Sequence, residues 1–147
     1  MITSFEEELR RSGRVIYRTC GDSMLPLIRE GRDIPVIELQ TPPFRRYDIV
    51  LFRRGEHYVL HRVLKVFRTK TGNTYFIAGD NRAYGENVPE QCILGRMTAL
   101  WREDQLLNLP PVPFGCRFWR LRFVLLRCRN LLRKQYKKHS SPPFSQI

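Results

Sequence analysis

Short runs of apolar residues that alternate with polar ones recur along most of the chain. They occupy residues 15–20, 34–39, 48–53, 58–66, 74–77 and 93–101. Each run is rich in β-branched or aromatic residues and is bounded by Gly, Pro, Asn or charged turn residues, as strands are. The pattern predicts a mainly β domain built from short twisted sheets.

Helical patterns occur near both ends of the chain. Ser4, followed three positions later by Glu7, forms a capping-box pattern for a short helix that ends at Ser12, before Gly13. Between residues 118 and 136, apolar residues recur at helical spacing with arginines and lysines beside them. We therefore expect a short N-terminal helix and a basic, partly amphipathic C-terminal helix.

The positive charge is concentrated behind the predicted strands. The chain carries 26 Lys and Arg against 14 Asp and Glu, a formal net charge of +12, and the region from Gln105 onward holds nine of these basic residues and no acidic one. This distribution favours a β domain over residues 1–104 and a basic arm over residues 105–147, whose Ser- and Pro-rich end is typical of disorder.

Targeting and cofactor signals are weak throughout the chain. The start is acidic, with no apolar core of a signal peptide, and the uncharged run over residues 105–116 is too short to span a bilayer and is broken by prolines. The four cysteines have no metal-ligand spacing. We expect a cytoplasmic or peripherally membrane-associated protein that needs no cofactor.

One serine and one histidine are the strongest candidates for chemistry. Ser23 lies in the segment 21–26 (Gly-Asp-Ser-Met-Leu-Pro), just past a predicted strand, and His61 shares one face of a later strand with Val59 and Val63. A serine hydroxyl needs a base to attack a carbonyl, and a neutral imidazole can supply one. The alternatives are a serine that only shapes a turn and a histidine hydrogen-bonded in the core.

Several ordered boxes between residues 15 and 101 carry a family resemblance. They are Gly-Asp-Ser-Met-Leu-Pro at 21–26, Tyr-Asp-Ile-Val at 47–50, His-Arg-Val at 61–63, Gly-Asp-Asn-Arg at 79–82, Val-Pro-Glu at 88–90 and Gly-Arg at 95–96. Together they resemble the superfamily of type I signal peptidases and LexA-like self-cleaving proteases. The resemblance implies a small β peptidase domain with Ser23 as nucleophile. His61 stands where endoplasmic-reticulum-type signal peptidases have a histidine base and the other members a lysine.

A third, acidic member would fix the tautomer of His61. The resemblance points to Glu86, a few residues past the Gly-Asp-Asn box, although Asp is usual there. Asp80 is the second candidate, and its alternative role is to cap the backbone of its own turn. The backbone N–H of Ser23, joined by that of Asp22, is the expected source of hydrogen bonds to an oxyanion.

Two functions from different classes remain open. The first is a serine endopeptidase that cleaves a signal peptide, leader peptide or precursor protein through Ser23 and His61. The second is a non-catalytic module on the same fold that binds a peptide, a membrane or a nucleic acid. For the basic arm we expect either an anionic membrane surface, with Trp119 and Phe123 buried in it, or packing on the β domain. No helix-turn-helix or RNA-binding motif supports nucleic acid.

Overall fold

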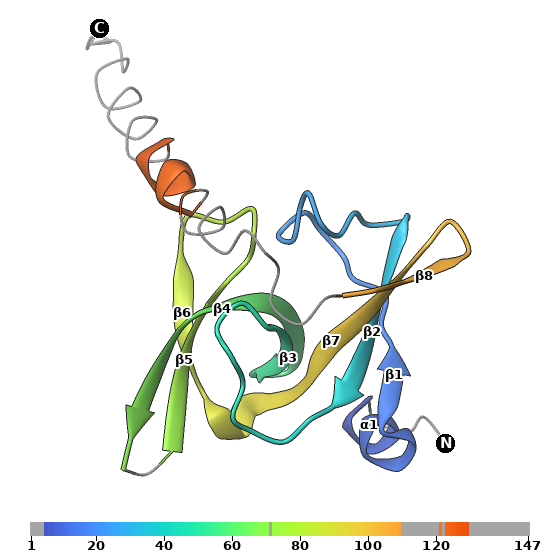
Figure 1. Cartoon of the computed structure of the whole chain (residues 1–147), viewed down its shortest axis with the longest axis horizontal. Helices are drawn as coiled ribbons and strands as arrows, with labels where there is room; N and C mark the ends of the chain where they lie inside the picture. The colour runs from blue at the N-terminus through green and yellow to red at the C-terminus, as the bar shows by residue number, and fades with distance from the viewer. Residues whose placement is uncertain (1–4, 71, 110–120, 122, 130–147) are drawn as a thin grey trace, which may run out of the picture.

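The computed structural model describes residues 5–70, 72–109, 121 and 123–129 (Figure 1). An N-terminal helix is followed by eight strands and one turn of 3-10 helix. In chain order they are α1 (Phe5–Ser12), β1 (Arg14–Ile16), β2 (Asp33–Leu39), β3 (Ile49–Arg54), β4 (His57–Thr69), β5 (Gly72–Ala78), β6 (Gly85–Pro89), η1 (Glu90–Cys92), β7 (Ile93–Arg102) and β8 (Gln105–Asn108). The mainly β class that the sequence predicts is confirmed.

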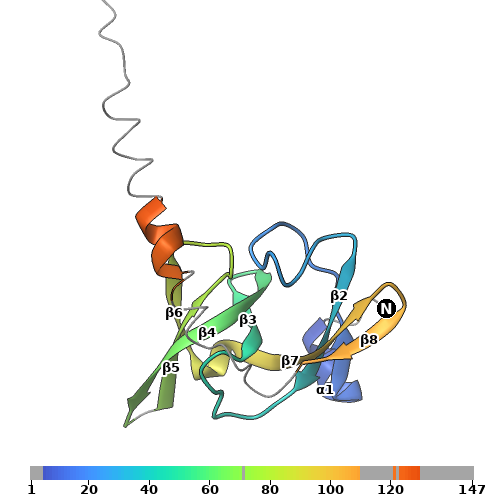
Figure 2. The same ribbon diagram turned by 45° about the horizontal axis from the view of Figure 1, so that its top comes forward.

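All eight strands join one antiparallel sheet. Its order is β1-β2-β7-β3-β4-β5-β6, and β8 pairs with β7 off this path. Figures 1 and 2 show β4, β5 and β6 on one side of β3, and β1, β2, β7 and β8 on the other. The central β3 therefore connects two halves of a coiled sheet.

Strand β3 is apolar without alternation because both of its faces are covered. Ile49 and Leu51 belong to one core cluster, which also holds Leu9 of α1. Val50 and Phe52 belong to a second cluster, formed with side chains of β5 and β6. Successive side chains of a strand point to opposite faces, so one strand supplies two cores.

Helix α1 packs its apolar face on the core cluster that contains Ile49 and Leu51, and it contacts two aromatic rings. Leu9 is 1% exposed, and the ring of Phe5 lies 5.2 Å from that of Tyr17 and 5.1 Å from that of Tyr58, centroid to centroid. The helix ends where the sequence predicts, with Gly13 in the left-handed region and its N–H bonded to the Leu9 carbonyl. Ser4, the expected cap, lies outside the described residues.

All the predicted strands are present, although β4 and β5 are longer than expected, and the structure differs from the prediction more clearly at three places. Residues 17–20, expected to extend the first strand, lie outside β1 and lead into the turn that carries Ser23. Strand β6 was not predicted, because Gly85–Pro89 is polar and contains Pro and Gly, which disfavour strands. Strand β8 continues the sheet past residue 104, the expected end of the β domain, as far as Asn108.

A C-terminal helix over residue 121 and residues 123–129 packs against the β5–β6 half of the sheet (Figures 1 and 2). Phe123 meets Phe76 of β5 edge to face at 6.1 Å, and Leu126 is 8% exposed. Phe123 thus packs on the domain, which is one of the two arrangements expected for the basic arm. Trp119 and the remainder of the predicted helix lie outside the described residues. Among the described residues, no helix has the length and apolar character needed to cross a bilayer.

Candidate active site

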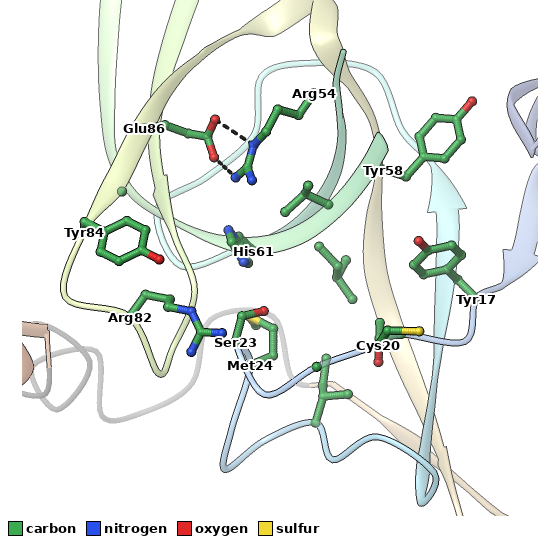
Figure 3. A pocket seen from close by; sticks show the side chains of 16 residues that line it. Tyr17, Cys20, Ser23, Met24, Arg54, Tyr58, His61, Arg82, Tyr84 and Glu86 are labelled. Atoms are coloured by element: carbon green, nitrogen blue, oxygen red, sulfur yellow. Dashed lines mark hydrogen bonds and ion pairs between the residues drawn. The ribbon is translucent and has the colours of Figure 1, made fainter. Parts of the chain in front are cut away.

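Three separate segments of the chain line a cleft of about 470 Å³ (Figure 3). The segment that follows β1 contributes Ser23, β4 contributes His61, and the β5–β6 connection with β6 contributes Arg82 and Glu86. Three of the four residues expected to act in catalysis therefore line one cleft, and Asp80 is not among its lining residues.

Ser23 sits on a tight turn whose conformation requires a glycine. Gly21 has a φ of 87°, which favours a residue without a Cβ, and its N–H donates to the Glu30 carboxylate at 2.7 Å. Met24, directly after the serine, is 4% exposed and belongs to the first core cluster. The turn is thus fixed on both sides of Ser23, which keeps the serine at the cleft.

His61 projects from the middle of a rigid strand. It pairs with Val50 of β3, and its ring lies 6.2 Å from that of Phe52. Burial, and then the positive charges of Arg54 and Arg82, lower the pKa of His61 to about 4. The imidazole is therefore neutral at pH 7 and able to accept a proton.

Gly79 brings the serine turn and the imidazole together. A Cβ atom at this position would lie 2.7 Å from the Ser23 carbonyl oxygen and 3.1 Å from His61 Nε2, so only glycine allows this approach. Within the residues that the structure describes, no hydrogen bond joins the Ser23 hydroxyl to His61. Catalytic hydrogen bonds are often long in the absence of substrate and tighten when it binds.

Glu86 lies in the cleft, but its carboxylate is bound by an arginine. Arg54 Nε donates to Glu86 Oε2 at 3.1 Å, and Arg54 Nη2 donates to the other carboxylate oxygen. Figure 3 shows this pair on one side of His61 and Ser23 on the other. The structure thus places Glu86 in the same cleft as the expected base, with its carboxylate bound to Arg54.

Asp80 holds a buried arginine behind the cleft. Its two carboxylate oxygens accept hydrogen bonds from Arg62 Nε at 2.7 Å and Nη2 at 2.8 Å, and Arg62 Nη1 donates to the Tyr47 carbonyl at 3.0 Å. The two side chains of this ion pair are 4% and 2% exposed. Arg62 follows His61 on β4, so the two side chains leave the strand on opposite faces.

A clasp that no local sequence pattern predicts joins the two loops of the site. Arg82 Nη2 donates to Asp22 Oδ1 at 2.5 Å, which lowers the pKa of the Asp22 carboxyl group. Next to it, the Asn81 N–H donates to the Ser23 carbonyl at 2.8 Å, and Asn81 Nδ2 donates to the Asp22 carbonyl at 3.3 Å. The clasp therefore orients Asp22 and the backbone of the nucleophile candidate itself.

The backbone N–H of Ser23 donates to no acceptor among the described residues. This donor therefore fits the role expected of it, which is to bind the negative oxygen of a tetrahedral intermediate. In the described part of the chain, no cluster of three or more His, Cys, Asp or Glu side chains is suited to hold a metal ion.

No protein-family model matches the chain, and no curated protein matches it in sequence. The functional assignment therefore depends on the residues of the cleft and on their geometry.

Proposed function

We propose that the protein is a serine endopeptidase in which Ser23 is the nucleophile and His61 the general base. The observation that carries the proposal is that Ser23 and His61 line one cleft, while the Ser23 carbonyl and His61 Nε2 both approach Gly79. The order of the sequence boxes between residues 15 and 101, which resembles that of signal peptidases and LexA-like proteases, supports the same assignment.

The proposed chemistry uses the neutral imidazole of His61. It accepts the proton of the Ser23 hydroxyl as the oxygen attacks a peptide carbonyl, and the resulting imidazolium then protonates the leaving amine. The backbone N–H of Ser23 donates to the oxyanion. Water hydrolyses the acyl-enzyme in a second step with the same base.

In the absence of substrate, both candidate acids are bound by arginines, so we propose a catalytic dyad of Ser23 and His61 and not a triad. Asp80 is committed to Arg62, and Glu86 is bound by Arg54. Because the Arg54 charge lowers the pKa of His61, any contact that draws Arg54 away from the imidazole makes His61 a stronger base. A substrate carboxylate that binds Arg54 would have this effect.

The substrate is a peptide or the exposed segment of a precursor protein. Besides Ser23 and His61, the cleft is lined by the apolar residues Met24, Ile28 and Leu60 and by the rings of Tyr17 and Tyr58. It can therefore accept an apolar side chain next to the scissile bond. By the resemblance, a signal or leader peptide is the class of substrate we propose.

A peptide library tests the proposal. The purified protein is incubated with peptides from a digested proteome, and new termini are identified by mass spectrometry. We expect cleavage by the wild type and by Ser12→Ala, a matched change of an exposed serine outside the cleft. Ser23→Ala should lower cleavage about 10³-fold or more.

Two results would contradict the enzyme. One is cleavage by Ser23→Ala at the wild-type rate. The other is a folded wild-type protein that cleaves no peptide, which would favour the non-catalytic binding module.

A further inference from the structure

The C-terminal helix has a second apolar face that the domain does not cover. Its first face is docked, because Phe123 packs on Phe76 and Leu126 is buried. Phe123 also lines a small cavity with Gly79 and Asp80. The docked face therefore lies directly behind the segment that joins the serine turn to the imidazole.

The other face consists of large apolar side chains exposed to solvent. Leu121 is 57% exposed, Val124 53% and Leu125 58%, and Cys128 is exposed as well. Successive helical residues are about 100° apart, so these four side chains form one stripe opposite Leu126. A surface helix normally presents polar residues on the side away from its domain.

Arginines border this stripe on both sides. The same helical spacing places Arg127 along one edge and Arg129 along the other, and both are exposed. The sequence from Gln105 onward adds seven further Lys or Arg and no acidic residue. The surface thus combines an apolar strip with flanking positive charge, in a part of the sequence that is rich in Lys and Arg.

We propose that the stripe of Leu121, Val124, Leu125 and Cys128 inserts into the interface of an anionic lipid bilayer. The flanking arginines then reach the headgroup phosphates, while their aliphatic stems cover the apolar boundary. The negative potential of such a surface attracts the basic residues of the helix. The bilayer satisfies both features of the helix, its exposed apolar area and its charge.

Two other binding partners, a nucleic acid and a second copy of the chain, match this surface less well. A nucleic acid would use the cations but would leave the apolar stripe in water. A second copy of the chain, paired through the same face, would bring two strongly basic arms together without an acidic residue between them.

Vesicle sedimentation of the full chain tests this surface. Wild type should sediment with phosphatidylcholine vesicles that contain phosphatidylglycerol, and more weakly with phosphatidylcholine alone. The variant Leu121→Gln/Val124→Gln/Leu125→Gln keeps every charge and should lose about tenfold or more in binding. The matched control Ile16→Gln/Leu39→Gln/Leu106→Gln removes apolar side chains that are 61%, 47% and 44% exposed, and it should bind as wild type does.

Three results would overturn the proposal. They are equal vesicle binding by the helix variant and the wild type, no binding by wild type, and binding to duplex DNA but not to vesicles. A wild-type dimer that the helix variant dissociates, without vesicle binding, would assign the stripe to a second copy instead. Ser23→Ala should bind vesicles as wild type does, so this test and the peptidase test can fail separately. Circular dichroism confirms that each variant is folded.

Discussion

Two arginine–carboxylate pairs lie near His61, and they differ in their exposure to solvent. Behind the cleft, Arg62 and Asp80 are 4% and 2% exposed. In the cleft, Arg54 and Glu86 are 50% and 35% exposed. Asp80 and Glu86, the two candidates for a third catalytic residue, thus each belong to one of these pairs.

The difference in burial assigns different roles to the two acids. Breaking a buried pair leaves an uncompensated charge in a medium that solvates it poorly, so Asp80 cannot leave Arg62 at low cost. An exposed pair gains little from its contact and can rearrange. Asp80 therefore has a structural role and fixes β4 to the segment 79–82. Glu86 belongs to an exposed pair whose side chains can rearrange within the cleft.

The largest expected effect is on stability. Asp80→Asn removes the carboxylate that pairs with the buried Arg62 and should lower the free energy of unfolding by about 3–5 kcal/mol, measured by urea denaturation. Glu86→Gln, the matched change in the exposed pair, should cost at most about 1 kcal/mol. Equal losses in the two variants would remove the distinction between the pairs.

The next effect is on catalysis and concerns Gly79, which lies against both the serine turn and His61. Gly79→Ala places a Cβ atom against the Ser23 carbonyl and the imidazole, which displaces the serine turn. We expect kcat/KM for a cleaved peptide to fall about 100-fold. A variant with the wild-type kcat/KM and a wild-type fold would show that this approach has no part in catalysis.

The buried imidazole itself should make stability depend on pH. Its pKa is lowered from 6.5 to about 4 in the folded chain, so the unfolded chain binds more protons between these values. This contribution is fully present above pH 6.5 and is lost as the pH falls toward 4. Because the ring is partly exposed, we expect about 2 kcal/mol less stability at pH 4 than at pH 7 from this residue. Denaturation of wild type and His61→Gln at both pH values measures it, and the same pH dependence in both proteins would contradict it.

The smallest effect tests the exposed pair alone. The positive charge of Arg54 lowers the pKa of His61, so Arg54→Met should raise it, as followed by NMR titration of the imidazole. Arg53→Met is the matched control, because Arg53 is also an exposed β3 arginine and instead faces Glu6 of α1 at 3.5 Å. A His61 pKa that does not rise in Arg54→Met, or that rises equally in Arg53→Met, would contradict this account.

Local patterns predicted much of the fold. The hairpin of β3 and β4 follows from apolar residues on both sides of Gly55, and α1 from its cap pattern and Gly13. Strand β6 could not be predicted this way, because its residues disfavour strands and its pairing with β5 decides its conformation. The opposite happens at residues 17–20. Their β propensity predicts a strand, but the turn before Ser23 overrides it.

The candidate site was only partly predictable. Ser23 and His61 stand out because their local boxes are specific, and the structure brings both to one cleft. The partners of the charged residues are not readable from local sequence. Glu86 binds an arginine 32 positions away, and Asp22 binds one 60 positions away. Such pairs depend on how the sheet coils, which no local pattern specifies.

The pH profile of kcat/KM for wild type and His61→Ala tests the central assignment most directly. The free-enzyme pKa of the base determines the acid limb of this profile. We predict a wild-type limb near pH 4, as the pKa of His61 requires, and a loss of about 10³-fold or more in His61→Ala across the plateau. A His61→Ala variant that cleaves as fast as wild type, with the same acid limb, would show that His61 is not the base.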